Sequence, residues 1–325
     1  MKNQFPEGAY TSLKQLLQLQ YKSKGYSFLP NQPLNSVLAG RHSSRLRGRG
    51  LDFEELRMYQ RGDDTRTIDW KVSNRTRKPY VRVYGEEKER QVMFLVDQRL
   101  SMFFGSQRSF KSVSAAECLA LGAWKVIDSG DRVGGIIFND SEIREFKAQR
   151  SRKSLSSMLN ETVKMNQNLA VNKGIEENPL MLNKALNLLL RKAKHNTLFI
   201  IISDFSGLNE DTHHHVQKLS QHNDVVLALI YDKIAREFPH NPFPLRVSDG
   251  LDQVELDLSS SKLRKSIPDL LEGRLKSLSD ALNKFHVPIL PINTHEDVSD
   301  QLRSLLGNGT SQPSIPTRIM RGSRT

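Results

Sequence analysis

Two apolar runs that each end in an aspartate constrain the fold of this chain more than any other feature. The first, QVMFLVD, ends at Asp97 with Ser101 four residues later, and the second, TLFIIISD, ends at Asp204. Short, nearly continuous apolar runs bounded by polar residues are typical of buried parallel strands. Open α/β sheets bind their ligands outside the carboxyl ends of such strands. We therefore expect Asp97 and Asp204 to form an acidic site at one edge of a single sheet.

Patterns typical of strands and helices alternate along the second half of the chain. After the first apolar run, residues 109–128 are apolar nearly all round, which is typical of a helix buried against a sheet. Further strands are predicted at 131–139, 143–147, 224–231, 254–258 and 286–292, and further helices at 151–164, 180–194, 211–221, 263–285 and 296–306. This alternation predicts an α/β fold with a doubly wound, mostly parallel sheet flanked by helices.

Changes in composition divide the chain into four parts. Residues 1–47 contain a short amphipathic helix and a basic connector, and residues 48–90 have the pattern of a small β-rich subdomain that packs on the sheet. Residues 91–307 carry the α/β pattern. Residues 308–325 are rich in Gly, Ser, Pro and Arg, so we expect a disordered basic tail.

The net charge of +12 is concentrated at the two ends of the chain. Residues 1–90 carry 18 Lys and Arg against 10 Asp and Glu, whereas residues 91–307 carry 27 against 26. Basic ends of this kind attract nucleic acid, anionic lipid or an acidic protein surface, and charge alone does not choose among them.

The sequence argues against several compartments and several kinds of chemistry. Its one cysteine excludes an internal disulfide. The sequence shows neither a secretion signal nor an apolar run of the ~20 residues that span a bilayer. We therefore expect a cytoplasmic protein. It contains no G-x-x-x-x-G-K-[ST], no strand-coupled G-x-G-x-x-G, no G-x-S-x-G and no H-E-x-x-H. No nucleotide, acyl-transfer or zinc-protease site is therefore indicated.

Three motifs resemble those of a known family. Residues 48–59, GRGLDFEELRMY, and 62–71, GDDTRTIDWK, are similar to the hallmark segments of domain-of-unknown-function family 58. DQRLSM, which starts at Asp97, is similar to the D-x-S-x-S metal-ion-dependent adhesion motif of von Willebrand factor A domains. The family-signature residues in the first two segments are Arg49, Asp52, Arg57, Tyr59, Gly62, Asp63, Arg66, Asp69 and Trp70.

The resemblance implies both a fold and a function. The fold is a von Willebrand A-like α/β domain, in a soluble member of the family without transmembrane helices. The function is that of a non-enzymatic adaptor, working with a MoxR-type AAA+ ATPase in assembly, maturation or a stress response. Other von Willebrand A-like proteins are further partners that the resemblance suggests.

The adhesion motif is degenerate in this chain. Asp97, Ser101 and Asp204 match the metal ligands that the resemblance implies, but Arg99 stands in place of the first hydroxyl, and no threonine precedes the helix at 180–194. Mg²⁺ takes oxygen ligands, and a guanidinium beside the ion repels it.

Two arrangements of Arg99 follow, with a third interpretation beside them. In the first, which we favour, Arg99 pairs with Asp97 or Asp204 as an internal cation and the site needs no metal. In the second, Arg99 points outward and leaves a weakened Mg²⁺ site, completed by water and by Glu177 or Asn178. In the third, the two aspartates only cap the helices that follow them.

The second hallmark segment surrounds Trp70 with charges of both signs. We expect an ordered surface network of these charges with the indole as a packing anchor, which fixes the small subdomain on the α/β domain. A partner-docking surface is the alternative.

Three functions remain in competition. The interaction module is favoured because the sequence shows no nucleophile with an adjacent base. Nucleic-acid binding through the basic N-terminal region is the alternative, although no known RNA- or DNA-reading motif is present. A metal-dependent hydrolase that uses Asp97 and Asp204 is the third, and too few acids and histidines converge for a two-metal site.

Overall fold

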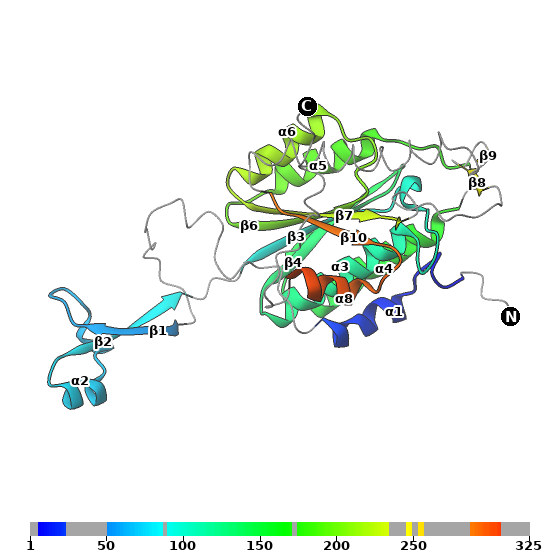
Figure 1. The fold of residues 1–325 in the computed structure, drawn as a ribbon. Coiled ribbons are helices and arrows are strands. Elements are labelled where there is room, and N and C mark those ends of the chain that lie inside the picture. The colour runs from blue at the N-terminus through cyan, green and yellow to red at the C-terminus, as the bar shows by residue number, and fades with distance from the viewer. Residues whose placement is uncertain are drawn as a thin grey trace, which may run out of the picture. The chain divides into compact units, whose positions relative to one another are not determined.

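A computed structural model describes residues 6–23, 51–86, 90–170, 174–233, 245–248, 253–256 and 287–306. The chain divides into two compact units, Met1–Pro33 with Arg90–Thr325, and Leu34–Glu89. We call them the main unit and the small unit, and each is described by itself (Figure 1). The predicted helix at 263–285, the tail at 308–325 and the connector beyond residue 23 lie outside the described residues.

A six-stranded sheet forms the centre of the main unit. In chain order its strands are β3 (Gln91–Asp97), β4 (Arg132–Phe138), β5 (Ile143–Gln149), β6 (Thr197–Ser203), β7 (Asp224–Tyr231) and β10 (Ile289–Asn293). Their order in space is β10-β7-β6-β3-β4-β5, with β5 antiparallel and every other pair parallel. The strand order reverses between β3 and β6, which is the switch point of a doubly wound sheet. The predicted α/β fold, with a doubly wound and mostly parallel sheet, is confirmed.

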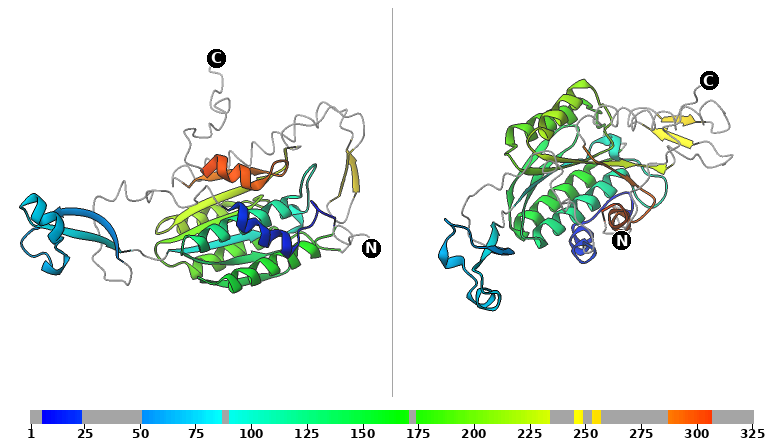
Figure 2. Two further views of the ribbon diagram at one scale, coloured as in Figure 1. Left: turned by 90° about the horizontal axis from the view of Figure 1, so that it is seen from below. Right: turned by 60° about the vertical axis from the view of Figure 1, so that its left-hand side comes forward.

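Helices cover both faces of this sheet (Figures 1 and 2). One face carries α1 (Leu13–Gln18), α3 (Lys111–Asp128), α4 (Arg152–Asn168) and α8 (Val298–Leu306). The other carries α5 (Leu180–Lys192) and α6 (Glu210–Ser220). Successive strand residues point to opposite faces, so Phe94 joins the first core and Leu95 the second. Helix α3 is apolar nearly all round because it lies between the sheet and other helices of its layer.

The N-terminal helix belongs to the core of the main unit. Leu16 is fully buried, and the indole nitrogen of Trp124 donates to its carbonyl oxygen at 3.2 Å. The hydroxyl of Tyr10 donates to the carbonyl of Leu169 at 2.8 Å, which ties the same segment to the end of α4. Residues 6–23 are thus held by packing and by hydrogen bonds.

A second, two-stranded sheet lies outside the central one. β8 (Leu245–Ser248) pairs antiparallel with β9 (Gln253–Leu256). The strand expected at 254–258 corresponds to β9, and its partner is the neighbouring hairpin strand β8. Residues 257 and 258 lie outside the described residues.

The small unit is a β-hairpin with a short helix. β1 (Leu51–Met58) pairs antiparallel with β2 (Tyr80–Glu86), and α2 (Trp70–Thr76) lies in the connection between them. The sequence analysis did not predict α2. Its start is fixed by Asp69, whose carboxylate accepts hydrogen bonds from the backbone N–H groups of Lys71 and Val72 at 3.0 and 3.1 Å.

Candidate functional site

The two predicted aspartates meet at the switch point of the sheet. Asp97 is the last residue of β3, and Asp204 follows β6, the strand that pairs with β3 in parallel. Both side chains are buried, with 0% and 4% of their surface exposed. We call this cluster, built around Asp97, Arg99, Lys111 and Asp204, the strand-end site.

Arg99 points inward and pairs with Asp97. Its Nη2 lies 2.7 Å from Asp97 Oδ2 and its Nε 3.0 Å from Asp97 Oδ1, while its backbone N–H donates to the same Oδ1 at 3.0 Å. The side chain is 2% exposed, and its guanidinium carbon lies 5.6 Å from the centre of the Phe138 ring. Burial alone would lower the pKa of Arg99, but Asp97 holds it above its ordinary value. Arg99 is therefore a permanent internal cation.

Asp204 has a cation of its own in Lys111. The ammonium of Lys111 lies 2.6 Å from Asp204 Oδ2, and the guanidinium of Arg99 is 4.0 Å from Asp204 Oδ1. Burial alone would raise the pKa of Asp204, but these cations and the backbone N–H of Ser206 lower it to about 2. Lys111 lies in the first turn of α3, where a positive charge is unfavourable because of the helix dipole. Its ion pair with Asp204 compensates for this position.

Hydroxyl groups complete the environment of the two carboxylates. Ser203 donates to Asp97 Oδ2 at 2.6 Å, and Ser101 reaches Asp204 Oδ1 at 3.5 Å. The predicted residue Ser101 thus lies in the site, at the limit of hydrogen-bonding distance.

A third aspartate, Asp140, orders the loops around the site. It follows β4, and its carboxylate accepts from the backbone N–H groups of Leu100 at 2.6 Å and Asn178 at 2.8 Å. Burial raises its pKa, although these N–H donors partly offset the shift. Asp140 therefore connects the loop after β3 to the loop before α5.

The loop before α5 reaches the site through its backbone. Pro179 offers its carbonyl to Arg99 Nη1 at 3.5 Å, and Gly207, at φ +81°, packs against the ring of Pro179. A Cβ on Gly207 would meet Pro179 Cβ at 2.6 Å, so this approach requires glycine. The predicted contributor Asn178 contacts Asp140, and the side chain of Glu177 is exposed.

The donor set does not suit Mg²⁺ in this arrangement. Each of the two carboxylates is within 2.7 Å of a cationic nitrogen, and Arg99 lies between them. Within the part of the chain that the structure describes, no three His, Cys, Asp or Glu side chains are grouped so as to hold a metal ion. The internal-cation arrangement is the one that the geometry fits.

Most of the family-signature residues lie in the small unit. Arg57 forms a two-pronged ion pair with Asp63 at 2.8 and 2.7 Å, and Arg82 pairs with Asp69 at 2.9 Å. The side chain of Trp70 is 65% exposed, so the indole is not packed within the small unit. Its expected role in fixing the small unit on the α/β domain stays a prediction. The remaining signature residues are Asp52 on β1, Tyr59 after it, Gly62 at φ +109° and the exposed Arg66, whereas Arg49 lies outside the described residues.

A second polar cluster has the residue types of a catalytic triad without its geometry. The hydroxyl of Ser106 lies 2.8 Å from His295 Nε2 and 2.6 Å from Asp232 Oδ1. The same Nε2 is 3.3 Å from that carboxylate oxygen. In a working triad the acid binds the other ring nitrogen and the serine is left to attack. Thr294 also donates to Asp232, at 2.5 Å, so this cluster connects the loop before α3 to the ends of β7 and β10.

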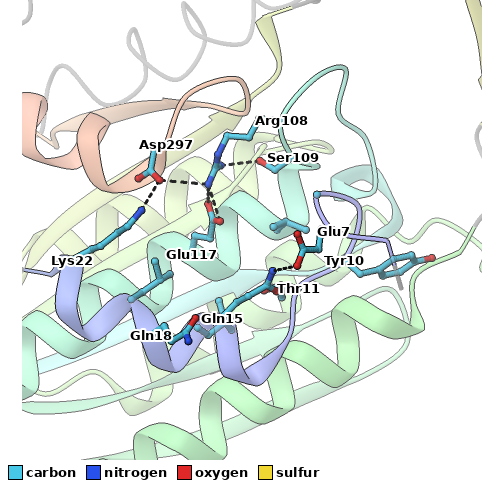
Figure 3. A pocket seen from close by; sticks show the side chains of 14 residues that line it. Glu7, Tyr10, Thr11, Gln15, Gln18, Lys22, Arg108, Ser109, Glu117 and Asp297 are labelled. Atoms are coloured by element: carbon cyan, nitrogen blue, oxygen red, sulfur yellow. Dashed lines mark hydrogen bonds and ion pairs between the residues drawn. The ribbon is translucent and has the colours of Figure 1, made fainter. Parts of the chain in front are cut away.

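A pocket of about 400 Å³ lies between the N-terminal segment, α3 and the start of α8 (Figure 3). Arg108 lies 2.9 and 3.0 Å from the two carboxylate oxygens of Glu117, and Lys22 lies 3.0 Å from Asp297. Burial raises the pKa of Glu117, partly offset by Arg108. The Lys22–Asp297 pair joins the N-terminal segment to the residue before α8, and Arg108, which lies 3.9 Å from Asp297, connects that pair to Glu117 of α3.

The comparison with protein families identifies the chain. The family described as "Protein of unknown function DUF58" matches residues 55–271, which is more than half of the sequence, so the chain belongs to this family. Within the described residues, no helix is both long enough and apolar enough to cross a membrane.

Two curated relatives are uncharacterized proteins of mycobacteria. Rv1480 of Mycobacterium tuberculosis and Mb1516 of Mycobacterium bovis are each 32% identical over 176 residues. The match covers 54% of this chain and 54% of each relative, so the chain spans about half the length of the curated relatives it matches.

Two solved structures are similar at low identity. BatB from Bacteroides thetaiotaomicron is 12% identical, covers 65% of this chain and 93% of its own, and superposes with a TM-score of 0.36. The SpRpn10 VWA domain is 11% identical, covers 69% and 100%, and has a TM-score of 0.35. At these TM-scores neither likeness adds to the argument about function.

Removing the internal cation alone will destabilise the protein severely. In Arg99→Met the carboxylate of Asp97 stays buried without its partner, which costs about 3–5 kcal/mol of the free energy of unfolding. The double variant Asp97→Asn with Arg99→Met removes both charges and recovers most of that loss. Urea denaturation at pH 7 measures all three proteins.

The exposed pair between Lys192 and Glu145 supplies the control, since Lys192→Met breaks an ion pair of 3.0 Å that water screens. An Arg99→Met variant no less stable than Lys192→Met would contradict the prediction.

The pairing of Asp204 with Lys111 predicts a pH-dependent stability. Because the folded pKa of about 2 lies below the usual value of about 3.9, this stabilisation is fully present above pH 4 and is lost as the pH falls through 2. Lys111→Met should cost roughly 2 kcal/mol at pH 7, and the difference from the wild type should shrink between pH 4 and pH 2. Denaturation at a series of pH values tests this, and a difference that does not change with pH would refute it.

Proposed function

We propose that this protein is a non-enzymatic interaction module that docks partners at its strand-end site without a metal ion. The observation that carries the proposal is the buried ion pair of Arg99 with Asp97 at the switch point. In this proposal Arg99 performs the electrostatic task of the ion in a complete adhesion site, which is to compensate the acidic residues at the strand ends.

The charges of the site are balanced internally. Asp97 and Asp204 carry two negative charges, and Arg99 and Lys111 carry two positive ones, at distances of 2.7 and 2.6 Å. A Mg²⁺ ion held by only a few protein oxygens keeps coordination positions that an oxygen of a partner can take. A closed ion-pair network has no such position, so a partner must be recognised by the surface around it.

That surface has an exposed apolar element. Leu180, the first residue of α5, is 61% exposed, and its neighbour Pro179 is exposed while its carbonyl contacts Arg99. Apolar side chains next to a rigid polar centre are suited to protein docking, because they supply area to bury while the centre fixes the surrounding loops. Leu180 is therefore the docking anchor in this proposal.

The partner is a MoxR-type AAA+ ATPase, which the family resemblance suggests. In such a pair this chain is the adaptor in an assembly, maturation or stress response. The closest approach to a catalytic arrangement within the described residues is Ser106 with His295 and Asp232, and its hydrogen bonds are those of a structural connection. The family resemblance and the structural hydrogen bonds of the Ser106 cluster both support the role of an adaptor.

The proposal predicts tight binding that does not depend on a divalent cation. A MoxR-type ATPase from the same organism should bind it with the same Kd in EDTA as in Mg²⁺, measured by biolayer interferometry with nucleotide-free ATPase. Leu180→Asp should weaken binding tenfold or more, because it places a charge in a buried contact.

Tyr21→Asp is the matched control, since Tyr21 is also an exposed apolar residue, 75% exposed, in the turn after α1. Loss of binding in EDTA would show a working metal site. Equal weakening by the two variants would remove the strand-end site as the docking surface.

A further inference from the structure

Three large apolar side chains of the small unit are exposed. Among its described side chains, Val81 is the only buried hydrophobic residue. Leu56, Met58 and Trp70 are exposed by 37, 50 and 65%, and they are three of the five large exposed hydrophobic residues in the described chain. Exposed apolar residues that cluster in one small region mark an interaction surface more often than scattered single ones do.

Helix α2 gathers the most exposed of these residues with cations on one face. Trp70 and Asn74 are four residues apart, as are Lys71 and Arg75, and all four are exposed. Residues at this spacing lie on the same side of a helix. The opposite side carries Ser73, which is buried and accepts from the backbone N–H of Tyr80 at 2.9 Å. We call Trp70, Lys71, Asn74 and Arg75 the α2 face.

Positive charge predominates in residues 56–82, the segment that carries the α2 face, whereas the remaining described residues of the small unit, 51–55 and 83–86, add four acids and no cation. Residues 56–82 contain eight Lys and Arg against three Asp. Two of the acids are paired, Asp63 with Arg57 and Asp69 with Arg82, and Asp64 caps a turn. Six exposed cations form no ion pair with another described residue: Arg61, Arg66, Lys71, Arg75, Arg77 and Lys78.

We propose that the α2 face is a second docking surface, which binds an acidic surface of a partner protein with Trp70 as its apolar anchor. The inference rests on the proposed function, because the partner is the same ATPase that docks at the strand-end site. When two surfaces bind the same partner, the first contact raises the effective concentration for the second, so the overall affinity exceeds that of either contact alone. Neither contact then needs to be strong by itself.

The composition of the surface favours a protein over a nucleic acid. Protein interfaces are enriched in Trp, Met and Arg, and their strongest contacts come from Trp and Arg. Binding of single-stranded nucleic acid uses several aromatic side chains in succession, on which bases stack. The α2 face has one aromatic residue, and the other exposed large apolar residues among the described side chains of this unit, Leu56 and Met58, offer no stacking surface.

The test uses the full chain and the purified ATPase. Trp70→Ala should weaken binding tenfold or more, and Lys71→Glu with Arg75→Glu should weaken it at least as much and flatten the dependence of Kd on salt between 50 and 300 mM NaCl. Lys218→Glu, at an exposed position near the end of α6, is the charge control and should leave Kd within twofold.

Each outcome bears on the inference in a different way. If the wild type binds and only Leu180→Asp weakens binding, the α2 face is not a docking surface while the proposed function stands; if the wild type does not bind, both fall. Thermal melts of the free variants should match the wild type, and a large fall in Tm for Trp70→Ala would show that the indole has a structural role instead. Two results would overturn the inference. One is that the protein binds a labelled 30-nucleotide dT strand more tightly than the ATPase and that the charge-reversal variant loses this binding, which would make nucleic acid the occupant. The other is self-association in sedimentation that Trp70→Ala abolishes.

Discussion

The buried ion pair between Arg99 and Asp97 is the interaction on which the strand-end site depends. A parallel sheet brings acids together wherever neighbouring strands end in aspartate, and at the switch point two such acids share one buried edge. Uncompensated, these charges would cost several kcal/mol each, so a cation must be present. Here the chain supplies it through a side chain that is 2% exposed and makes hydrogen bonds to both oxygens of Asp97.

The ion pair also determines how the surrounding loops are held. Arg99 reaches the carbonyl of Pro179, and Asp140 binds the backbone of both Leu100 and Asn178. The loops after β3 and before α5 are therefore fixed to one another through charged groups below the surface. In the proposed complex, a partner that docked on Leu180 would meet loops that are already fixed, so binding would order little further backbone of this chain. In the small unit the α2 face is exposed, and its two charged residues, Lys71 and Arg75, are both positive.

The sequence predicts the two aspartates of the strand-end site but not the residues that reach them from elsewhere in the chain. The meeting of Asp97 and Asp204 follows from two apolar runs, because parallel strands align their carboxyl ends. Lys111 and Asp140 were missed because each is a single polar residue whose role depends on tertiary contacts, 93 residues away in the case of Lys111. Helix α2 was missed because its seven residues lack apolar periodicity, and the signal that could have found it is the capping residue Asp69. The 65% exposure of Trp70 was not predicted either, because large aromatic residues are usually buried and the sequence does not show which of them are exceptions.

A thermal melt with and without 10 mM Mg²⁺, run on the wild type, Arg99→Ser and Asp97→Ala, tests the central claim most directly. A ligand present at about 100 times its Kd stabilises the native state by about 2.7 kcal/mol, which is an easily measured shift in Tm. The account predicts no shift for the wild type, and a lower Tm for Arg99→Ser that Mg²⁺ raises, since the serine restores a hydroxyl ligand where the guanidinium stood. A wild-type shift that disappears in Asp97→Ala would contradict it, because it would place a metal ion where Arg99 is proposed to act.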